Sequence, residues 1–201
     1  MTRFLLIRHG DTDAIGRYIA GNVPGTNLND TGRAQVETLV RRLRDVPLTA
    51  VVSSPLERTR QTADPIARDH ALDVELAPGL SEFDFGAWTG ATFESLARNA
   101  VWERFNAIRS VTPAVRGELM LDVQRRSVAA LIDLWSRHST GAVAVVSHGD
   151  VIRAILLFVL GMPIDFYWRL EVQPARISVV EFSDGAPRVL QVNGDTASGV
   201  V

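Results

Sequence analysis

The sequence predicts an α/β protein, specifically a three-layer α/β/α sandwich with a mainly parallel central sheet. Short apolar runs bounded by turn residues alternate along the chain with longer stretches of helical period. This alternation is typical of parallel strands whose sheet is covered by helices on both faces. A length of 201 residues and an apolar fraction of 46% fit one domain covering residues 1–201, because single domains usually hold about 100–200 residues.

The short apolar runs are the predicted strands, and they lie at residues 4–7, 48–53, 74–76 and 142–146. Two further runs, 176–182 and 188–192, alternate apolar and polar residues on either side of Asp184-Gly185. An Asp-Gly pair between alternating runs is a hairpin signal. The sheet is therefore expected to end in a β-hairpin, and the small, polar residues 195–201 after it are expected to form a flexible tail.

Apolar residues at helical spacing predict helices over residues 32–44, 55–70, 92–109, 119–137 and 149–160. The second of these begins with Ser54, Pro55 and Glu57, which match a serine N-cap, a proline at the first helical position and the glutamate of a capping box. Residues 91–118, which include the helical pattern of 92–109, are expected to form a helical cap insertion over the functional site.

The composition excludes several classes of function. Cysteine is absent, which rules out disulfides, thiolate metal sites and a cysteine nucleophile. All 21 basic residues are arginine, so lysine Schiff-base chemistry is excluded while arginine–phosphate recognition is available. A net charge of −2 gives no basic face for nucleic acid, and no apolar run is long enough for a signal peptide or a membrane span. We therefore expect a cytoplasmic protein without nucleic-acid or membrane partners; a homodimer is left open.

Three predicted strands end in reactive residues. The strand at 4–7 runs into Arg8-His9, and the strand at 142–146 runs into His148. The strand at 48–53 runs into a helix that carries Arg58 in its first turns. In a parallel sheet the carboxyl ends of the strands lie on one edge, where ligands bind. We therefore expect His9, Arg58 and His148 to meet there. The other two histidines, at positions 70 and 138, fall near helix ends among polar residues and are expected to face solvent.

These residue types suit phosphoryl transfer. A phosphoryl group in transfer spreads negative charge over its oxygens, so catalysis depends on positioning and on electrostatic stabilisation. The planar guanidinium groups of Arg8 and Arg58 match phosphate oxygens. They also favour the neutral form of His9 by charge repulsion, which keeps an imidazole nitrogen available as the nucleophile.

The leaving alkoxide also needs a proton. Residues 80–86 supply two candidate acids, Glu82 and Asp84, among the aromatic side chains of Phe83 and Phe85. Removing a carboxyl group from water raises its pKa toward the protonated form that a general acid requires. Glu82 is the better candidate, but these considerations alone leave the choice between the two carboxyl groups open.

Four motifs together resemble the histidine phosphatase (phosphoglycerate mutase-like) superfamily. They stand in the family's order and cover nearly the whole chain: Arg-His-Gly at 8–10, Ser-Ser-Pro-Leu-Glu-Arg at 53–58, Ser-Glu-Phe at 81–83 and Ser-His-Gly at 147–149. The resemblance implies that His9 is the phosphorylated histidine and that Arg8, Arg58 and His148 form the phosphate pocket. It also implies that Glu82, rather than Asp84, is the proton donor, and that the enzyme needs no cofactor and no metal.

One departure from the family's pattern concerns the phosphate pocket. Where members often carry Asn, six residues after the nucleophile, this chain has Ile15, and Ala20 replaces a nearby Gln. Either another polar side chain compensates or the pocket holds phosphate less fully. The compensating candidates are Thr12, Asn22, Thr26 and Asn27.

The predicted function is a metal-independent phosphomonoester phosphatase, a hydrolase of the histidine acid phosphatase type, whose partner is a small phosphorylated metabolite. A phosphomutase is disfavoured because the segment between Glu82 and His148 is short and no lysine is present to hold a carboxylate. A catalytically weak phosphate-binding module stays open, as does a metal site built from His9, Asp11, His148 and Asp150. Within the cap, Arg98, Arg104 and Arg109 are candidates to meet an anionic substrate. The aromatic and aliphatic residues of the same segment are expected to pack into the cap rather than to line a substrate site.

Overall fold

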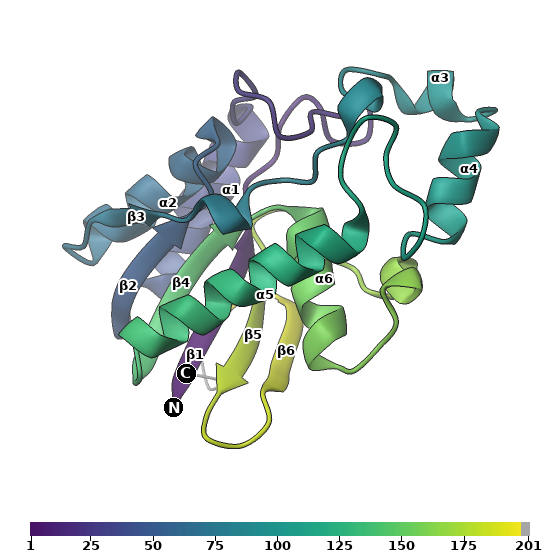
Figure 1. Cartoon of the computed structure of the whole chain (residues 1–201). Helices are drawn as coiled ribbons and strands as arrows, with labels where there is room; N and C mark the ends of the chain where they lie inside the picture. Colours follow the sequence, from purple (N-terminus) through teal and green to yellow (C-terminus); the bar gives the residue numbers. More distant parts are fainter. Residues whose placement is uncertain (198–201) are drawn as a thin grey trace.

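In the computed structural model, which describes residues 1–197, helices cover both faces of a six-stranded sheet (Figure 1). The strand order is β3-β2-β4-β1-β5-β6. The first four of these strands are mutually parallel, and the β5–β6 hairpin adds two antiparallel strands at one edge. The predicted three-layer architecture, the mainly parallel sheet and the hairpin are all confirmed. The strands are β1 (Thr2–Arg8), β2 (Leu48–Ser53), β3 (Val74–Leu76), β4 (Gly141–Ser147), β5 (Ile177–Phe182) and β6 (Arg188–Gly194).

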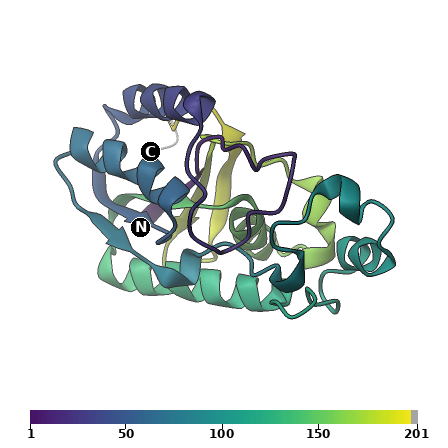
Figure 2. The same cartoon turned by 90° about the horizontal axis from the view of Figure 1, so that it is seen from above.

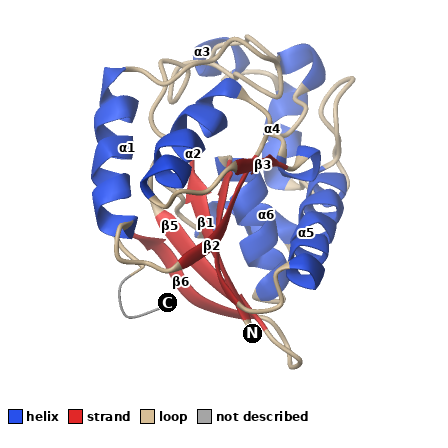
Figure 3. Ribbon diagram, turned by 90° about the vertical axis from the view of Figure 1, so that its left-hand side faces the viewer, coloured by secondary structure: helices blue, strands red, loops and turns tan. Residues whose placement is uncertain are grey.

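Alternate side chains of the central strands point into two separate cores. Leu5 and Ile7 of β1 pack with helices α1 and α2, whereas Phe4 and Leu6 pack on the opposite face with α5 and α6. Figures 2 and 3 show the two helical layers on either side of the sheet. None of the described helices is long and apolar enough to cross a membrane. The α-helices are α1 (Asp30–Leu43), α2 (Glu57–Asp69), α3 (Phe93–Leu96), α4 (Ala100–Ala107), α5 (Met120–Arg137) and α6 (Gly149–Val159), and the 3₁₀ helices are Pro78–Leu80, Gly86–Trp88 and Ile164–Arg169.

The predicted capping box of the second helix is wrong. Helix α2 begins at Glu57 with Leu56 as its N-cap, and no side chain caps it. Ser54 instead lies fully buried at the end of β2, where its hydroxyl group is 2.8 Å from Nε2 of His148. A tertiary partner has therefore displaced the local capping interaction that the sequence pattern suggests.

The helix expected over residues 92–109 is two helices, α3 and α4. The side chain of Asn99 accepts hydrogen bonds from the backbone N–H groups of Val101 (3.0 Å) and Trp102 (3.1 Å) and so starts a new helix. Asparagine is a favoured N-cap because its side chain satisfies amide groups that a helix leaves unpaired at its start. The first helix starts two residues before its predicted position for the same reason, since Asn29 caps Gly32 N–H at 2.8 Å.

Two expectations about solvent exposure also need correction. His70 is half-buried and its ring bonds to the carbonyl groups of Ile66 and Leu43, and His138 is half-buried as well. The start of the supposed flexible tail is packed, because Ala197 is fully buried and Asp195 forms an ion pair with Arg42. The remainder of the tail, 198–201, lies outside the described residues.

Candidate active site

The register of the two central strands brings the two strand-end histidines together. Arg8 at the end of β1 is opposite Ser147 at the end of β4, so the next residue of each strand, His9 and His148, is also adjacent. The backbone N–H of His9 donates to the Ser147 carbonyl at 3.0 Å, and the two imidazole rings have centroids 5.3 Å apart. The predicted meeting of these residues at the carboxyl edge of the sheet is what the structure shows.

A backbone contact fixes the proton on the His9 ring. Nδ1 lies 2.7 Å from the carbonyl oxygen of Gly10, so Nδ1 must carry the proton and donate, which leaves the lone pair on Nε2. Burial, together with the nearby guanidinium groups of Arg58 and Arg8, holds the pKa of His9 well below its ordinary value of 6.5. The imidazole is therefore neutral, with a free basic nitrogen, at neutral pH.

Gly10 is required by close packing of the loop that follows β1. A Cβ atom at this position would lie 2.8 Å from the backbone oxygen of Gly32, which is closer than real Cβ contacts permit. The absence of a side chain lets the loop turn against the start of α1, and the Gly10 N–H donates to the Thr62 hydroxyl group at 3.1 Å. The nucleophile candidate is thus held by a loop that α1 and α2 both support.

Arg8 and Arg58 each have guanidinium N–H groups without a partner in the described part of the chain. Nη1 of Arg8 donates to the Val172 carbonyl at 2.7 Å, and Nη2 of Arg58 donates to the Gly21 carbonyl at 2.7 Å. Nε of Arg8 and Nη1 of Arg58 are buried without such a bond. Burial lowers the pKa of both groups. Buried donors without acceptors are costly, so this arrangement suits an anion that accepts from both.

Glu82 lines the same cavity, and its carboxyl group is poised between protonation states. Its Oε1 accepts from the Phe83 N–H at 2.9 Å, while its Oε2 is 3.7 Å from Nδ1 of His148. Burial raises the pKa of Glu82 to about 7, and the charge of Asp150 adds to this, against the lowering effect of Arg58 and of the Phe83 N–H group. At neutral pH the group can therefore both give and take a proton.

Asp84, the other candidate acid, points elsewhere. Its Oδ1 accepts from the Gly86 N–H at 2.9 Å and its own N–H donates to Glu118 at 2.9 Å. These bonds stabilise the loop after Glu82, and Asp84 is not among the residues that line the cavity. Of the two candidate acids, only Glu82 therefore lies where it can reach a ligand in the cavity.

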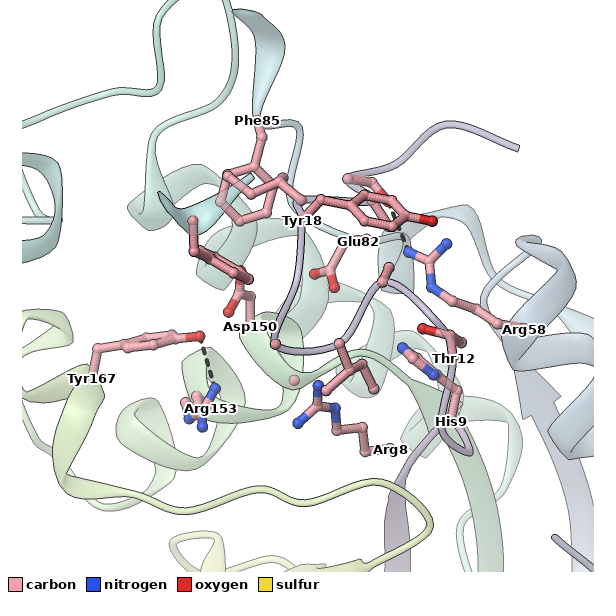
Figure 4. Close-up of a pocket in the computed structure, with 18 of the residues that line it drawn as sticks. Arg8, His9, Thr12, Tyr18, Arg58, Glu82, Phe85, Asp150, Arg153 and Tyr167 are labelled. Atoms are coloured by element: carbon pink, nitrogen blue, oxygen red, sulfur yellow. Dashed lines mark hydrogen bonds between the residues drawn. The ribbon is translucent and has the colours of Figure 1, made fainter. Parts of the chain in front are cut away.

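The cavity that His9 faces has a volume of about 280 Å³ (Figure 4). The cavity is lined by Arg8, His9, Arg58 and Glu82. His148 is fully buried and is not among the lining residues. Among the four polar residues that might compensate for Ile15, Thr12 lines the cavity, as does Ile15 itself.

The cap segment contributes unevenly to this cavity. Arg109 lines it, whereas Arg98 and Arg104 are exposed. Phe93 and Trp102 also line the cavity, so the expectation that the apolar cap residues only pack is wrong for these two. Phe105 and Leu96 do pack into the core.

Several cavity residues were not singled out from the sequence. Arg153, Tyr167 and Trp168 line the wall beside Asp150. The one available signal was the spacing of Asp150 and Arg153 on α6, which places both near the start of a helix that follows His148. Tyr167 and Trp168 lie in a 3₁₀ helix with no periodic pattern that would have marked them.

A metal centre receives no support from the side-chain geometry. Within residues 1–197, no three His, Cys, Asp or Glu side chains are placed so that they could hold a metal ion together. The alternative site of His9, Asp11, His148 and Asp150 would require such a cluster.

The layering, the strand order and the histidine pair at the carboxyl edge define a phosphoglycerate mutase-like fold. The chain belongs to the histidine phosphatase superfamily (branch 1), whose family model matches residues 4–195. This membership confirms the resemblance found in the four sequence motifs. Similar proteins include a phosphoserine phosphatase of Hydrogenobacter thermophilus and probable phosphoglycerate mutases.

Two relatives and one solved structure illustrate the range. A protein of Mycobacterium tuberculosis described as bifunctional is 38% identical over 198 residues, which are 96% of this chain and 54% of that protein; this chain thus spans about half its length. A probable phosphoglycerate mutase of Proteus mirabilis is 30% identical over 189 residues, 92% of this chain and 86% of that protein. A phosphoserine phosphatase mutant of Entamoeba histolytica, solved with phosphoserine, superimposes with a TM-score of 0.87 at 28% identity, covering 97% of this chain and 98% of that chain.

Proposed function

We propose that this protein is a phosphomonoester phosphatase that acts through a phosphohistidine intermediate on His9. The observation that carries the proposal is the free Nε2 of a neutral, buried His9 beside two guanidinium groups with unpaired N–H donors. A nucleophile needs a lone pair, and the transferring group needs fixed positive charge around its oxygens. Both requirements are met at the same end of one cavity.

In the first step Nε2 of His9 attacks phosphorus and the bond from phosphorus to the substrate oxygen breaks. Arg8 and Arg58 hold the phosphoryl oxygens throughout. The protonated carboxyl group of Glu82 gives its proton to the leaving oxygen, so that an alcohol departs. A pKa of about 7 leaves a large share of Glu82 protonated near neutral pH, which is what a general acid requires.

In the second step water replaces the alcohol. The Glu82 carboxylate takes a proton from water as the water oxygen attacks phosphorus. The bond between phosphorus and Nε2 then breaks, inorganic phosphate forms and both His9 and Glu82 return to their starting states. His148 lies behind this pair, with Nδ1 toward Glu82 and Nε2 on Ser54, and orients the site rather than reacting.

The proposal is tested by measuring phosphate release from a panel of small phosphomonoesters with wild type, His9→Ala and His138→Ala. His138 is a matched control because its carbonyl accepts from Thr2 at the start of β1, on the opposite edge of the sheet. We expect release to be lost in His9→Ala and kept in His138→Ala. Equal release by wild type and His9→Ala from every hydrolysed compound would overturn the proposal.

A phosphomutase is the second candidate, since a probable phosphoglycerate mutase is among the similar proteins. The two functions differ in the acceptor of the phosphoryl group. Adding a bisphosphorylated glycerate to a phosphoglycerate substrate and following products by ³¹P NMR separates them. A phosphatase yields inorganic phosphate and is indifferent to the addition, whereas a mutase yields the positional isomer and depends on it.

A further inference from the structure

A row of charged and aromatic side chains continues the cavity beyond the phosphate end. Arg8 and Arg153 both pack against Gly149, because a Cβ there would be 3.3 Å from Cζ of Arg8 and 3.5 Å from Nη1 of Arg153. Arg153 then donates to the Tyr167 hydroxyl group at 2.9 Å, as the dashed line in Figure 4 marks. The guanidinium carbon of Arg109 lies 3.9 Å from the centre of the same tyrosine ring. Arg109 and Arg153 therefore both contact the Tyr167 ring, and Arg153 also lies next to Arg8 at the phosphate end.

Arg109 is held rigidly but its hydrogen bonds are incomplete. Its side chain is 3% exposed, and it stacks on Tyr167 and on Phe105, the latter at 4.5 Å. Nη2 donates to Asn106 at 2.7 Å, whereas Nε and Nη1 have no acceptor among the residues described. Stacking fixes the plane of the guanidinium and occupies its faces, but its N–H edge still needs an acceptor.

Arg126 shows what a structural arginine looks like in this protein. Its guanidinium donates to the carbonyl groups of Gly79, Ser81 and Glu82 and to the Glu118 carboxylate, at distances of 2.7–3.0 Å. All three of its nitrogens are engaged by these acceptors. The unpaired N–H groups of Arg109 are therefore not a general property of half-buried or buried arginines in this fold, and Arg109 is one of the residues that line the cavity.

The charges that line the cavity do not balance. Four arginines, at positions 8, 58, 109 and 153, face two carboxylates, at positions 82 and 150. A phosphate group engages the first two arginines under the proposed function. The excess is largest in the state in which Glu82 is protonated, when Asp150 alone opposes Arg109 and Arg153. A second negative charge on the ligand would restore the balance.

We propose that Arg109, with Arg153 beside it, binds a second anionic group of the substrate, so that the substrate is a small phosphomonoester that also carries a carboxylate or a second phosphate. This inference rests on the proposed function, because it takes the phosphate end of the cavity as the reacting end. Arg109 is then a binding residue that sets specificity, and the cavity of about 280 Å³ has room for a small metabolite.

Pairs of compounds that differ in one anionic group test the proposal. O-phosphoserine is compared with O-phosphoethanolamine, and 3-phosphoglycerate with glycerol 3-phosphate, for a carboxylate. Fructose 1,6-bisphosphate is compared with fructose 6-phosphate for a second phosphate. The ratio of kcat/KM within each pair is measured for wild type, Arg109→Met, Arg109→Lys and Arg104→Met, an exposed arginine of the same cap. The pair with the larger wild-type ratio identifies which anion is recognised.

We expect wild type and Arg104→Met to favour the anionic member of at least one pair by about 10-fold or more, as a charge-assisted hydrogen bond implies. Arg109→Met should lose that ratio and Arg109→Lys should keep part of it. An unchanged ratio in Arg109→Met, with hydrolysis that still depends on His9, would overturn this inference alone. Melting temperatures establish that each variant is folded. If Arg109→Met does not fold, the ratio measured for Arg109→Lys is used for the test instead.

Failure of the proposed function gives a different result, namely phosphate release that does not depend on His9. In that case the dissociation constants of the same pairs, measured by calorimetry on His9→Ala protein with and without Arg109→Met, decide the matter. Selective binding of the anionic member that Arg109→Met removes supports the inference. Equal binding of both members by the His9→Ala protein overturns it.

Discussion

Ser54 and His148 are joined by a 2.8 Å contact between the serine hydroxyl group and Nε2 of the imidazole ring, and both residues are fully buried. The contact connects the end of β2 to the end of β4. It also sets the plane of the His148 ring so that Nδ1 lies toward Glu82, 3.7 Å away. A residue that the sequence pattern assigns to a helix cap thus supports the proposed acid.

Ser54→Ala should destabilise the protein, because it leaves a buried ring nitrogen without its partner. We expect a loss of about 1–3 kcal/mol in the free energy of unfolding and a lower kcat on any substrate that wild type hydrolyses. Urea denaturation and steady-state kinetics measure the two effects. Ser136→Ala is the matched control, since Ser136 is exposed and donates only to Asp133 within its own helix. Equal stability of Ser54→Ala and wild type would contradict this account of the contact.

Glu82→Gln should make the folded protein more stable above pH 7. The pKa of Glu82 is raised from 4.5 to about 7 in the folded state, so the folded protein binds this proton more tightly than the unfolded chain. That contribution is fully present below pH 4.5 and is lost as pH rises through 7. Glutamine mimics the protonated form, so we expect a gain of up to about 3 kcal/mol at pH 8 that disappears at pH 4. Denaturation at both pH values measures it, with exposed Glu103→Gln as control. A gain that does not depend on pH would refute the raised pKa.

Arg58→Met should separate stability from anion binding. Arg58 is 1% exposed and has an unpaired Nη1, so relief of this buried charge is expected to offset the lost bond to the Gly21 carbonyl group, and the free energy of unfolding should change by no more than about 1 kcal/mol. The same change should weaken inhibition by vanadate by about 10-fold or more. Arg126→Met is the contrasting control, because the satisfied bonds of Arg126 predict a loss of stability. A marked loss of stability in Arg58→Met would show that this arginine is structural.

Ile15→Asn should strengthen phosphate binding. Ile15 lines the cavity at the position where family members often carry a polar amide, and an asparagine there supplies an N–H donor. One added neutral hydrogen bond implies about 2- to 10-fold tighter inhibition by inorganic phosphate. Ile15→Leu, which adds no donor, is expected to leave this inhibition constant as it is in wild type. Unchanged or weaker inhibition in Ile15→Asn would mean that Thr12 or the arginines already satisfy the phosphate.

The sheet and the histidine pair were predictable from sequence because they depend on local patterns. A buried strand is an apolar run, and the residue after it must lie at the sheet edge, which placed His9 and His148 correctly. The structure adds the register, in which Arg8 pairs with Ser147 and the two histidines become neighbours. Likewise the family motifs favoured Glu82 over Asp84, and of these two residues only Glu82 lines the cavity.

Features that depend on contacts between distant segments were not predictable. The role of Ser54 is set by His148, 94 residues away. The local sequence around Ser54 matches a helix-capping pattern, so sequence alone predicts a different role for this serine. Arg109 and Arg153 come from different segments and meet over Tyr167, although nothing in the sequence around any of them indicates the encounter. The break between α3 and α4 depends on which way the Asn99 side chain turns, which helical periodicity does not record.

The most direct test of the central claim is the chemical stability of the phosphorylated protein. A substrate found in the panel is labelled with ³²P, mixed briefly with the protein and quenched, and the label on the protein is mapped by peptide. We expect it on the peptide that contains His9, released by acid, preserved in alkali and absent from His9→Ala, because the bond from phosphorus to an imidazole nitrogen is broken by acid. A label that survives acid, or that lies on another residue, would contradict the account.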